Sequence, residues 1–320
     1  EADLDWLART SPPTDCGGLI QTIAQTRGVQ AECVLPGGGS SDLIYRAFGR
    51  WLKPSSRVLL LDPTYGEYVH ICKHVVGCNV EHFCLDAIDD FHLDVDKLHT
   101  RLQFGGFDLA VIVNPNNPTG QHVPRSTLES LLRDVPERTT VWIDEAYLEY
   151  VGAEASLERF ATNSANVVVC KSLSKVYALS GMRAAYLCGA AEMLAPLRWW
   201  TPPWVIGLPA QVAAVKALED PDYYRCCYEE TANLRRRIAR QLHEAQPAWR
   251  VMEGVANFVV CQLPANGSTA ADVVAQCRRR NLYLRDVGSM GMHLGDRCLR
   301  IAIKDDATLK RMLAILSEIT

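Results

Sequence analysis

The sequence predicts an α/β protein whose mostly parallel sheet lies between helices, followed by a smaller C-terminal α+β domain. A length of 320 residues corresponds to about two domains of roughly 150 residues each. Short, continuously apolar runs alternate with helical patterns through the first two-thirds of the chain, which is typical of parallel strands buried on both faces. After about residue 200 a long helical run leads into a second group of strands and helices.

The elements follow from these patterns in order. Val- and Leu-rich runs predict strands at residues 58–62, 109–114, 140–144, 167–170 and 184–188. Helical patterns separate them at residues 40–52, 66–76, 125–134 and 157–161. The C-terminal part is expected to hold helices at residues 209–219, 222–245, 270–281 and 307–320 and strands at residues 257–263, 283–287 and 298–303. Thr269 and Asp272 form a capping-box pattern at the start of the helix at 270–281.

Composition excludes several classes of protein. Thirty-three basic and 37 acidic residues give a net charge of −4, so we expect no basic surface for nucleic acid or anionic membranes. No apolar stretch approaches the ~20 residues that span a bilayer. The first residues lack the basic start and apolar run of a signal peptide, and we therefore expect a soluble cytoplasmic protein.

Cysteine and histidine spacing gives no metal site. The 12 cysteines include no Cys-x-x-Cys pair and several lie in apolar runs, which favours free thiols over disulfides or zinc ligands. His70 and His74 stand one helical turn apart, with Glu67 near the same face, but a pair at this spacing is more typical of a solvated helix face.

A glycine-rich segment precedes the first predicted helix. Residues 37–42 read Gly-Gly-Gly-Ser-Ser-Asp. Small residues at a helix start expose backbone N–H groups, and the helix dipole favours a phosphate there. A flexible loop explains the same residues equally well. Asp42 breaks the dinucleotide fingerprint Gly-x-Gly-x-x-Gly, and no lysine completes a P-loop.

Three successive strands carry polar residues at their carboxyl ends. Residues 114–120 read Asn-Pro-Asn-Asn-Pro-Thr-Gly, Asp144 ends the next strand, and Lys175 follows the third. A plain turn and a surface lysine are the ordinary interpretations of the first and the last. In open α/β folds, however, ligands bind at this edge of the sheet, so we expect the three groups to meet there.

The chemistry of these groups fits one cofactor. Asp144 on a buried strand needs a charged partner, and a cationic ring nitrogen would be one. A desolvated Lys175 near cations would have a lowered pKa and act as a nucleophile. Ser172, Ser174 and Arg183 are donors suited to a phosphate. A lysine, a carboxylate and anion donors are what pyridoxal phosphate requires.

Together these motifs resemble the fold-type I pyridoxal-phosphate enzymes of aminotransferase class I and II. The resemblance rests on residues 114–120, 144–147 and 172–175 and on Gly181-x-Arg183, and it extends from about Cys33 to Arg300. The branch that it resembles is that of histidinol-phosphate aminotransferase and threonine-phosphate decarboxylase. It implies a homodimer and pyridoxal 5′-phosphate as the cofactor.

The resemblance also implies roles for single residues. Lys175 would form a Schiff base with the cofactor and move protons, Asp144 would pair with the ring nitrogen, and Asn117 and Tyr147 would bind the ring oxygen. Tyr65 would stack on the ring. The phosphate would be held by Ser40, Ser41, Ser172, Ser174 and Arg183. Substrate binding is expected from Arg300, Arg285 and Asn257.

The domain limits follow from the same resemblance. It implies a large cofactor-binding domain at residues 33–220 and a connecting helix with the small domain at residues 221–320. Residues 1–32 would be a shortened arm and helix that pack near the small domain. The full arm of the family would then lie outside this sequence, or the sequence would be part of a longer polypeptide.

Two departures from the family bear on the substrate. The usual Gly-Asn-Gly-Ser-Asp-Glu is Gly-Gly-Gly-Ser-Ser-Asp here, and Pro203-Trp204-Val-Ile206 replaces a Pro-Tyr/Phe-Asn-Val element. Trp199, Trp200 and Trp204 are interpreted as packing or a dimer interface, with a substrate-facing wall as the alternative.

A cofactor site of this composition is compatible with three functions. The leading hypothesis is an aminotransferase for a small amino acid or amine that bears a carboxylate or phosphate. The alternative is a decarboxylase, or an elimination or replacement enzyme, that acts on a phosphorylated or modified amino acid. A cofactor-binding sensor is disfavoured because no helix-turn-helix segment precedes the fold and because Lys175, Asp144 and Arg300 are all retained.

Overall fold

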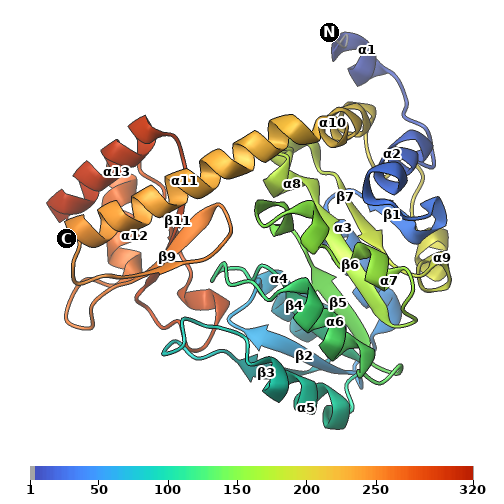
Figure 1. Cartoon of the computed structure of the whole chain (residues 1–320), viewed down its shortest axis with the longest axis horizontal. Coiled ribbons are helices and arrows are strands. Elements are labelled where there is room, and N and C mark those ends of the chain that lie inside the picture. The colour runs from blue at the N-terminus through green and yellow to red at the C-terminus, as the bar shows by residue number, and fades with distance from the viewer. Residues whose placement is uncertain (1–3, 320) are drawn as a thin grey trace.

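A seven-stranded sheet forms the larger part of the protein, and the structure, a computed structural model, describes residues 4–319 (Figure 1). The strand order is β1-β7-β6-β5-β4-β2-β3. The strands are β1 (Val34–Gly37), β2 (Arg57–Asp62), β3 (Asn79–Cys84), β4 (Leu109–Val113), β5 (Thr140–Asp144), β6 (Val167–Ser172) and β7 (Ala185–Cys188). Only β7 runs against its neighbours, so the predicted mostly parallel sheet is confirmed.

Helices cover both faces of this sheet. Alternate residues of β2 point to opposite sides, with Val58 and Leu60 in one apolar cluster and Leu59 and Leu61 in another. The first face is covered by α3 (Ser40–Trp51), α4 (Gly66–His70), the π-helical η2 (Ile71–Val76) and α9 (Ala191–Trp199). The second is covered by α2 (Gly17–Arg27), α5 (Val95–Gly105), α6 (Arg125–Arg133), α7 (Glu158–Ala161) and α10 (Leu208–Leu218). Burial on both faces explains the continuously apolar strands.

A four-stranded antiparallel sheet with the order β10-β11-β9-β8 forms the smaller part. Its strands are β8 (Arg250–Glu253), β9 (Phe258–Gln262), β10 (Arg285–Asp286) and β11 (Cys298–Ala302). Its helices are α12 (Ala270–Arg279), α13 (Asp306–Ile319) and the 25-residue α11 (Pro221–Ala245), which runs from α10 to this sheet (Figure 1). Thr269 and Asp272 form the predicted capping box at the start of α12. The domain boundary after residue 220 remains a prediction, and Thr320, the expected end of the last helix, lies outside the described residues.

The N-terminal segment does not lie where we expected it. We expected residues 1–32 near the small domain, but α1 (Leu4–Arg9) and α2 contact α10, and α2 also contacts β1 (Figure 1). Leu19 and Ile23 belong to the apolar cluster of the large sheet, and burial of these side chains holds α2 there. For its described part, the prediction was wrong.

Short helical turns complete the chain. They are η1 (Ala31–Cys33), η3 (Leu148–Tyr150), η4 (Ala153–Ala155), α8 (Leu173–Val176), η5 (Ser180–Met182) and η6 (Gly288–Met290). Within residues 4–319, no helix is long and apolar enough to cross a membrane, and no group of three or more potential metal ligands is found. All 12 cysteines are free thiols.

Candidate active site

One cavity of about 300 Å³ collects the predicted site residues from both parts of the molecule. Every one of them except Asn257 lines it. From the large sheet and its helices come Ser40, Ser41, Tyr65, Asn117, Asp144, Tyr147, Ser172, Ser174, Lys175 and Arg183, and from the smaller sheet come Arg285 and Arg300. β4, β5 and β6 are neighbours and parallel, so the polar groups that follow them meet at one edge.

The N-terminus of α3 and Arg183 form an anion-binding corner of this cavity. Ser40 and Ser41 begin α3, and no side chain caps this helix end. Arg183 donates from Nη1 to Ser174 Oγ at 3.3 Å and packs so closely on Gly39 that any side chain there would collide with the guanidinium. Free backbone N–H groups, the helix dipole and a guanidinium together favour a phosphate.

Asp144 is a buried carboxylate with only neutral hydrogen-bond donors. The Tyr68 hydroxyl donates to Oδ2 at 2.6 Å, and the Ala146 N–H donates to Oδ1 at 3.0 Å. Burial raises the pKa of Asp144, although these two hydrogen bonds act in the opposite direction. A cation placed against this carboxylate would therefore stabilise its ionised form.

Lys175 extends from α8 into the cavity beside two arginines. Partial burial lowers the pKa of its amine, and the positive charges of Arg300 and Arg183 lower it further. The neutral amine, which is the nucleophilic and proton-accepting form, is therefore favoured relative to an ordinary lysine.

Two arginines of the smaller sheet form the opposite wall. Arg285 on β10 pairs in register with Arg300 on β11. The Arg300 guanidinium lies 4.9 Å from the centroid of the Phe258 ring and donates to Asn117 Oδ1 at 2.5 Å. Burial lowers the pKa of Arg300, and the charge of Arg285 adds to this effect. Within residues 4–319, neither arginine forms an ion pair with an acidic side chain.

The structure places two further residues at the site that the sequence did not indicate. It also leaves one predicted residue outside the cavity. Asn257 does not line the cavity and instead makes a side-chain hydrogen bond with Tyr150. Tyr68, the partner of Asp144, was missed, although its place one helical turn after Tyr65 was a usable signal. Met290 also lines the cavity, and its sequence neighbourhood gave no signal.

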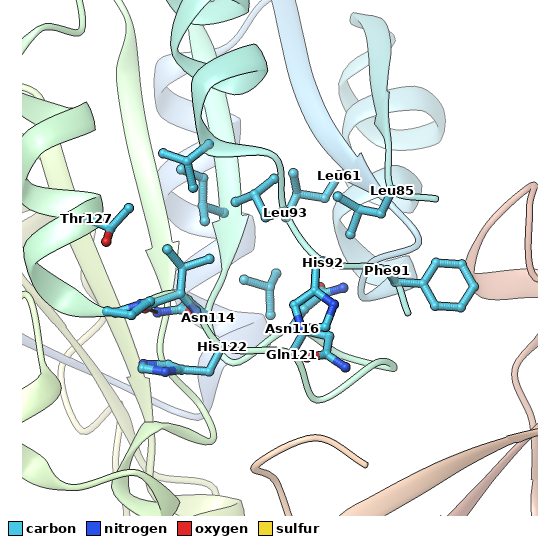
Figure 2. A pocket seen from close by; sticks show the side chains of 15 residues that line it. Leu61, Leu85, Phe91, His92, Leu93, Asn114, Asn116, Gln121, His122 and Thr127 are labelled. Carbon is cyan, nitrogen blue, oxygen red and sulfur yellow. Dashed lines mark hydrogen bonds between the residues drawn. The ribbon is translucent and has the colours of Figure 1, made fainter. Parts of the chain in front are cut away.

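A second cavity of about 210 Å³ lies behind the strand that leads to Asn117 (Figure 2). Its wall is mostly apolar and includes Leu61, Leu85 and Phe91, together with Asn116 and Gln121 of the loop after β4. Burial lowers the pKa of His122, whose Nε2 has no hydrogen-bond partner. Since no lysine, arginine or carboxylate lines it, this cavity lacks the groups needed for a charged cofactor.

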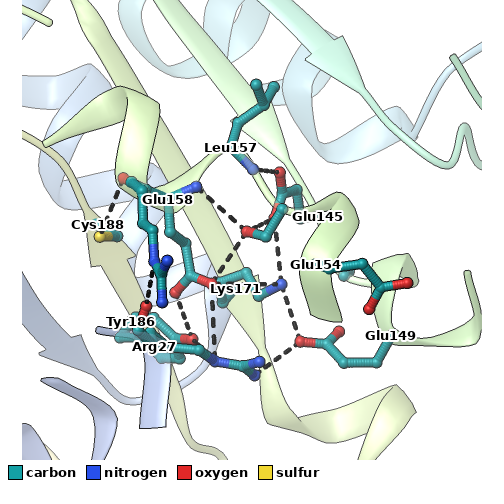
Figure 3. A network of polar contacts seen from close by, with 12 residues as sticks. Arg27, Glu145, Glu149, Glu154, Leu157, Glu158, Lys171, Tyr186 and Cys188 are labelled. Carbon is teal, nitrogen blue, oxygen red and sulfur yellow. Dashed lines mark hydrogen bonds and ion pairs between the residues drawn. The ribbon is translucent and has the colours of Figure 1, made fainter. Parts of the chain in front are cut away.

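A buried ionic network joins Lys171 and Arg27 to three glutamates next in sequence to, or close in sequence to, site residues (Figure 3). Lys171 Nζ is 2.8 Å from Glu149 Oε1 and 3.1 Å from Glu145 Oε2. Arg27 of α2 donates from Nη2 to the same Glu149 oxygen at 2.8 Å, and Glu158 lies beside both cations. Since Glu145 follows Asp144 and Lys171 precedes Ser172, this network fixes the backbone that presents the site residues.

Comparison with known proteins decides the family. The family model described as aminotransferase class I and II matches residues 8–316. The chain belongs to this family. This aminotransferase is 29% identical over 313 residues to the histidinol-phosphate aminotransferase of Paracoccus denitrificans, an alignment that covers 96% of this chain and 80% of the relative.

Solved structures share its fold. The histidinol-phosphate aminotransferase of Sinorhizobium meliloti in complex with pyridoxal 5′-phosphate has a TM-score of 0.87 at 22% identity, covering 97% of this chain and 82% of that one. The L-threonine-O-3-phosphate decarboxylase of Porphyromonas gingivalis has a TM-score of 0.83 at 22% identity, covering 98% and 91%. The predicted fold class is thereby confirmed.

The aminotransferase depends on pyridoxal 5′-phosphate, as predicted, and its cavity fits that cofactor. The uncapped end of α3 with Arg183 suits the phosphate. The buried carboxylate of Asp144 lacks a cation and suits a protonated ring nitrogen, and Lys175 supplies an amine for the aldehyde.

Proposed function

We propose that this aminotransferase acts on a small amine that carries a phosphate group. The observation that carries the proposal is the pair Arg285 and Arg300, which line the cavity side by side. Two guanidinium groups that repel one another are stabilised by a dianion between them. Each guanidinium can donate two hydrogen bonds to such a dianion. The names of the relatives point to the same substrate class.

The cofactor side is assigned to the residues around α3 and β5. Ser40, Ser41 and Arg183, with Ser172 and Ser174, would hold the cofactor phosphate. Asn117 and Tyr147 would bind the ring oxygen, and Tyr65 would stack on the ring. Asp144, held by Tyr68, would keep a proton on the ring nitrogen. When bound, pyridoxal phosphate withdraws electrons from the substrate carbon and so acidifies its C–H bond.

Lys175 is the group that moves the proton. Its amine is exposed in the cavity and its lowered pKa increases the neutral fraction near pH 7, so it can accept a proton from the substrate carbon. The same amine, once protonated, can donate that proton to a different atom from the one that lost it. Arg285 and Arg300 would hold the far end of the substrate and thereby orient its amine toward Lys175.

Replacing Asp144 with asparagine tests the charge at the ring nitrogen. We expect kcat to fall by about 10²-fold, since one preorganised electrostatic contact is lost while the shape is kept. The cofactor-free variant should be at least as stable as the wild type at neutral pH, because a buried carboxylate with a raised pKa destabilises the fold once it ionises. Steady-state rates measure the fall in kcat, and urea unfolding measures the stability. An unchanged kcat would show that Asp144 has no role in the reaction.

A decarboxylase remains the second candidate, and the fold it shares with the Porphyromonas gingivalis enzyme favours it. The two reactions differ in which bond of the substrate carbon breaks. Incubation of the holoenzyme with O-phosphothreonine separates them: carbon dioxide release without a keto product supports decarboxylation, whereas amino transfer supports the proposal.

The substrate class is tested by comparing histidinol phosphate with histidinol, with 2-oxoglutarate as acceptor and glutamate as the product measured. We expect kcat/KM to be at least about 10²-fold higher for the phosphorylated amine, because charged hydrogen bonds contribute about 1.5–3 kcal/mol each. Arg285→Gln should narrow this ratio while leaving the rate with histidinol unchanged. Equal rates for both amines would reject the phosphate specificity.

A homodimer and a cytoplasmic location complete the proposal. Trp199, at the end of α9, is 90% exposed, and Trp200 and Trp204, on the segment between α9 and α10, are 64% and 54% exposed. Exposed aromatic clusters of this kind are typical of protein interfaces. Sedimentation of the purified protein tests the dimer, with a monomer at micromolar concentration as the contradicting result, and cell fractionation tests the location.

A further inference from the structure

A backbone seam joins the two parts of the molecule beside the active site. The seam consists of residues 62–64, at the end of β2, and residues 290–292, at the end of η6. The Thr64 N–H donates to the Met290 carbonyl at 3.1 Å, and the Met292 N–H donates to Asp62 Oδ1 at 2.9 Å. Asp62 and Thr64 are each only 2% exposed, so the large-sheet side of both hydrogen bonds is buried, whereas Met292 on the other side is exposed.

Gly291 lies at the tightest point of this seam. A Cβ atom at this position would be 2.5 Å from Asp62 Oδ1 and 2.5 Å from Pro63 Cβ, and 2.7 Å from the Pro63 backbone. Its backbone is extended, with φ −174°, so the need for glycine comes from space and not from conformation. Any side chain would push residues 290–292 away from β2.

The large-sheet side of the seam is itself fixed. Asn116 Nδ2 donates to the Pro63 carbonyl at 3.0 Å and to Thr119 Oγ1 at 3.1 Å. Asn116 is 3% exposed and precedes Asn117 of the active site. These contacts tie residues 62–64 to the loop after β4 independently of residues 290–292.

The two sides of the seam lead directly into the cavity. Tyr65 follows Thr64 and lines the cavity from the large sheet. Met290 lines it from the other side, and Arg285, five residues earlier, starts the same connection from β10. Neither Asp62 nor Gly291 contacts the corner formed by Arg183 and α3.

We propose that Asp62 and Gly291 are positioning residues that hold the segment from Arg285 to Met290 at the distance the substrate requires. This inference rests on the proposed function for the identity of the substrate. It assigns the seam to substrate binding and not to cofactor binding, because the segment that it holds carries Arg285 and none of the residues that suit the cofactor phosphate or ring nitrogen.

The test uses the holoenzymes of Gly291→Ala and Asp62→Ala. We expect KM for histidinol phosphate to rise about tenfold, the order of one lost buried hydrogen bond. Deuterium uptake of residues 285–292 should increase, while affinity for pyridoxal phosphate should stay within about twofold of the wild type. Asp62→Asn keeps an Oδ1 acceptor, so its KM and its deuterium uptake should match those of the wild type.

Gly18→Ala is the matched control, because nothing lies within 4 Å of a Cβ atom at that position. Unchanged KM and unchanged deuterium uptake in Gly291→Ala and Asp62→Ala would overturn the proposal. A loss of cofactor affinity equal to the rise in KM would overturn it too, since it would indicate general loosening. If the wild type transfers no amino group from a phosphorylated amine, the proposed function fails, while deuterium uptake still decides the role of the seam.

Discussion

Replacing Lys175 with alanine is expected to lower kcat for amino transfer by at least about 10³-fold, because one change removes both the nucleophile and the proton carrier. The amine of Lys175 lies in the cavity between Arg183 and Arg300, and its pKa is lowered there by partial burial and by both charges. The protein should remain folded and should still bind the cofactor through its phosphate, since the corner formed by Arg183 and α3 is unchanged.

Two controls make this result specific. Lys310→Ala removes an exposed lysine from α13 and should leave kcat unchanged. Added methylamine should recover part of the lost rate in Lys175→Ala, because a free amine can enter the vacated space and carry the proton. Undiminished turnover by Lys175→Ala with bound cofactor would contradict the assigned role.

Lys171→Met is expected to destabilise the fold by about 3–5 kcal/mol at pH 8, because it leaves the buried carboxylate of Glu145 without a cation and Arg27 alone beside Glu149 and Glu158. Lys171 Nζ contacts Glu149 and Glu145 and lies near Glu158, all of them buried. Burial alone would lower the pKa of Lys171, but these three carboxylates outweigh it and raise the pKa. Urea unfolding of the cofactor-free protein measures the loss.

The stability lost in Lys171→Met should depend on pH in a defined direction. Burial alone would raise the pKa of Glu149, but Lys171 and Arg27 outweigh it and lower the pKa. Glu149 therefore contributes stability above its unfolded pKa of about 4.3, and this contribution is lost as the pH falls. Without Lys171 the folded-state pKa of the carboxylates rises, so the variant loses stability as the pH rises. The difference in free energy of unfolding between the variant and the wild type should therefore shrink toward about pH 5.

A double variant and a surface pair serve as controls for Lys171→Met. Adding Glu149→Gln removes one of the excess negative charges of the network and should recover part of the lost stability. Lys97→Met breaks an exposed pair with Asp94 and should leave the unfolding midpoint unchanged. A loss below about 1 kcal/mol for Lys171→Met would show that water or rearrangement replaces the lysine.

The site could be predicted because its groups follow parallel strands directly. Asn117, Asp144 and Lys175 are carried to one edge by β4, β5 and β6, whose apolar runs are plain in the sequence. Arg285 and Arg300 needed the resemblance, since nothing in a short antiparallel strand indicates that it faces a cavity whose other polar residues lie far earlier in the chain. Asn257 was placed by the same resemblance and does not line the cavity.

The elements that were missed share weak local signals. β3 lies at the edge of the sheet and is half-exposed, so its residues, Asn-Val-Glu-His-Phe-Cys, lack the apolar run of the inner strands. β10 has only two residues, where five were expected, because Tyr283 is 71% exposed and outside the sheet. The network around Lys171 joins residues 27, 145–158 and 171, and only tertiary contact reveals it; a lysine at the end of an apolar strand was its one local sign.

The most direct test of the account is a single turnover of the holoenzyme with histidinol phosphate and no keto acid. Transamination predicts that each active site converts one pyridoxal phosphate to pyridoxamine phosphate, measured by chromatography after denaturation. Lys175→Ala should show no conversion on the same time scale. Cofactor that remains pyridoxal phosphate in the wild type, with this amine and with other phosphorylated amines, would contradict the account.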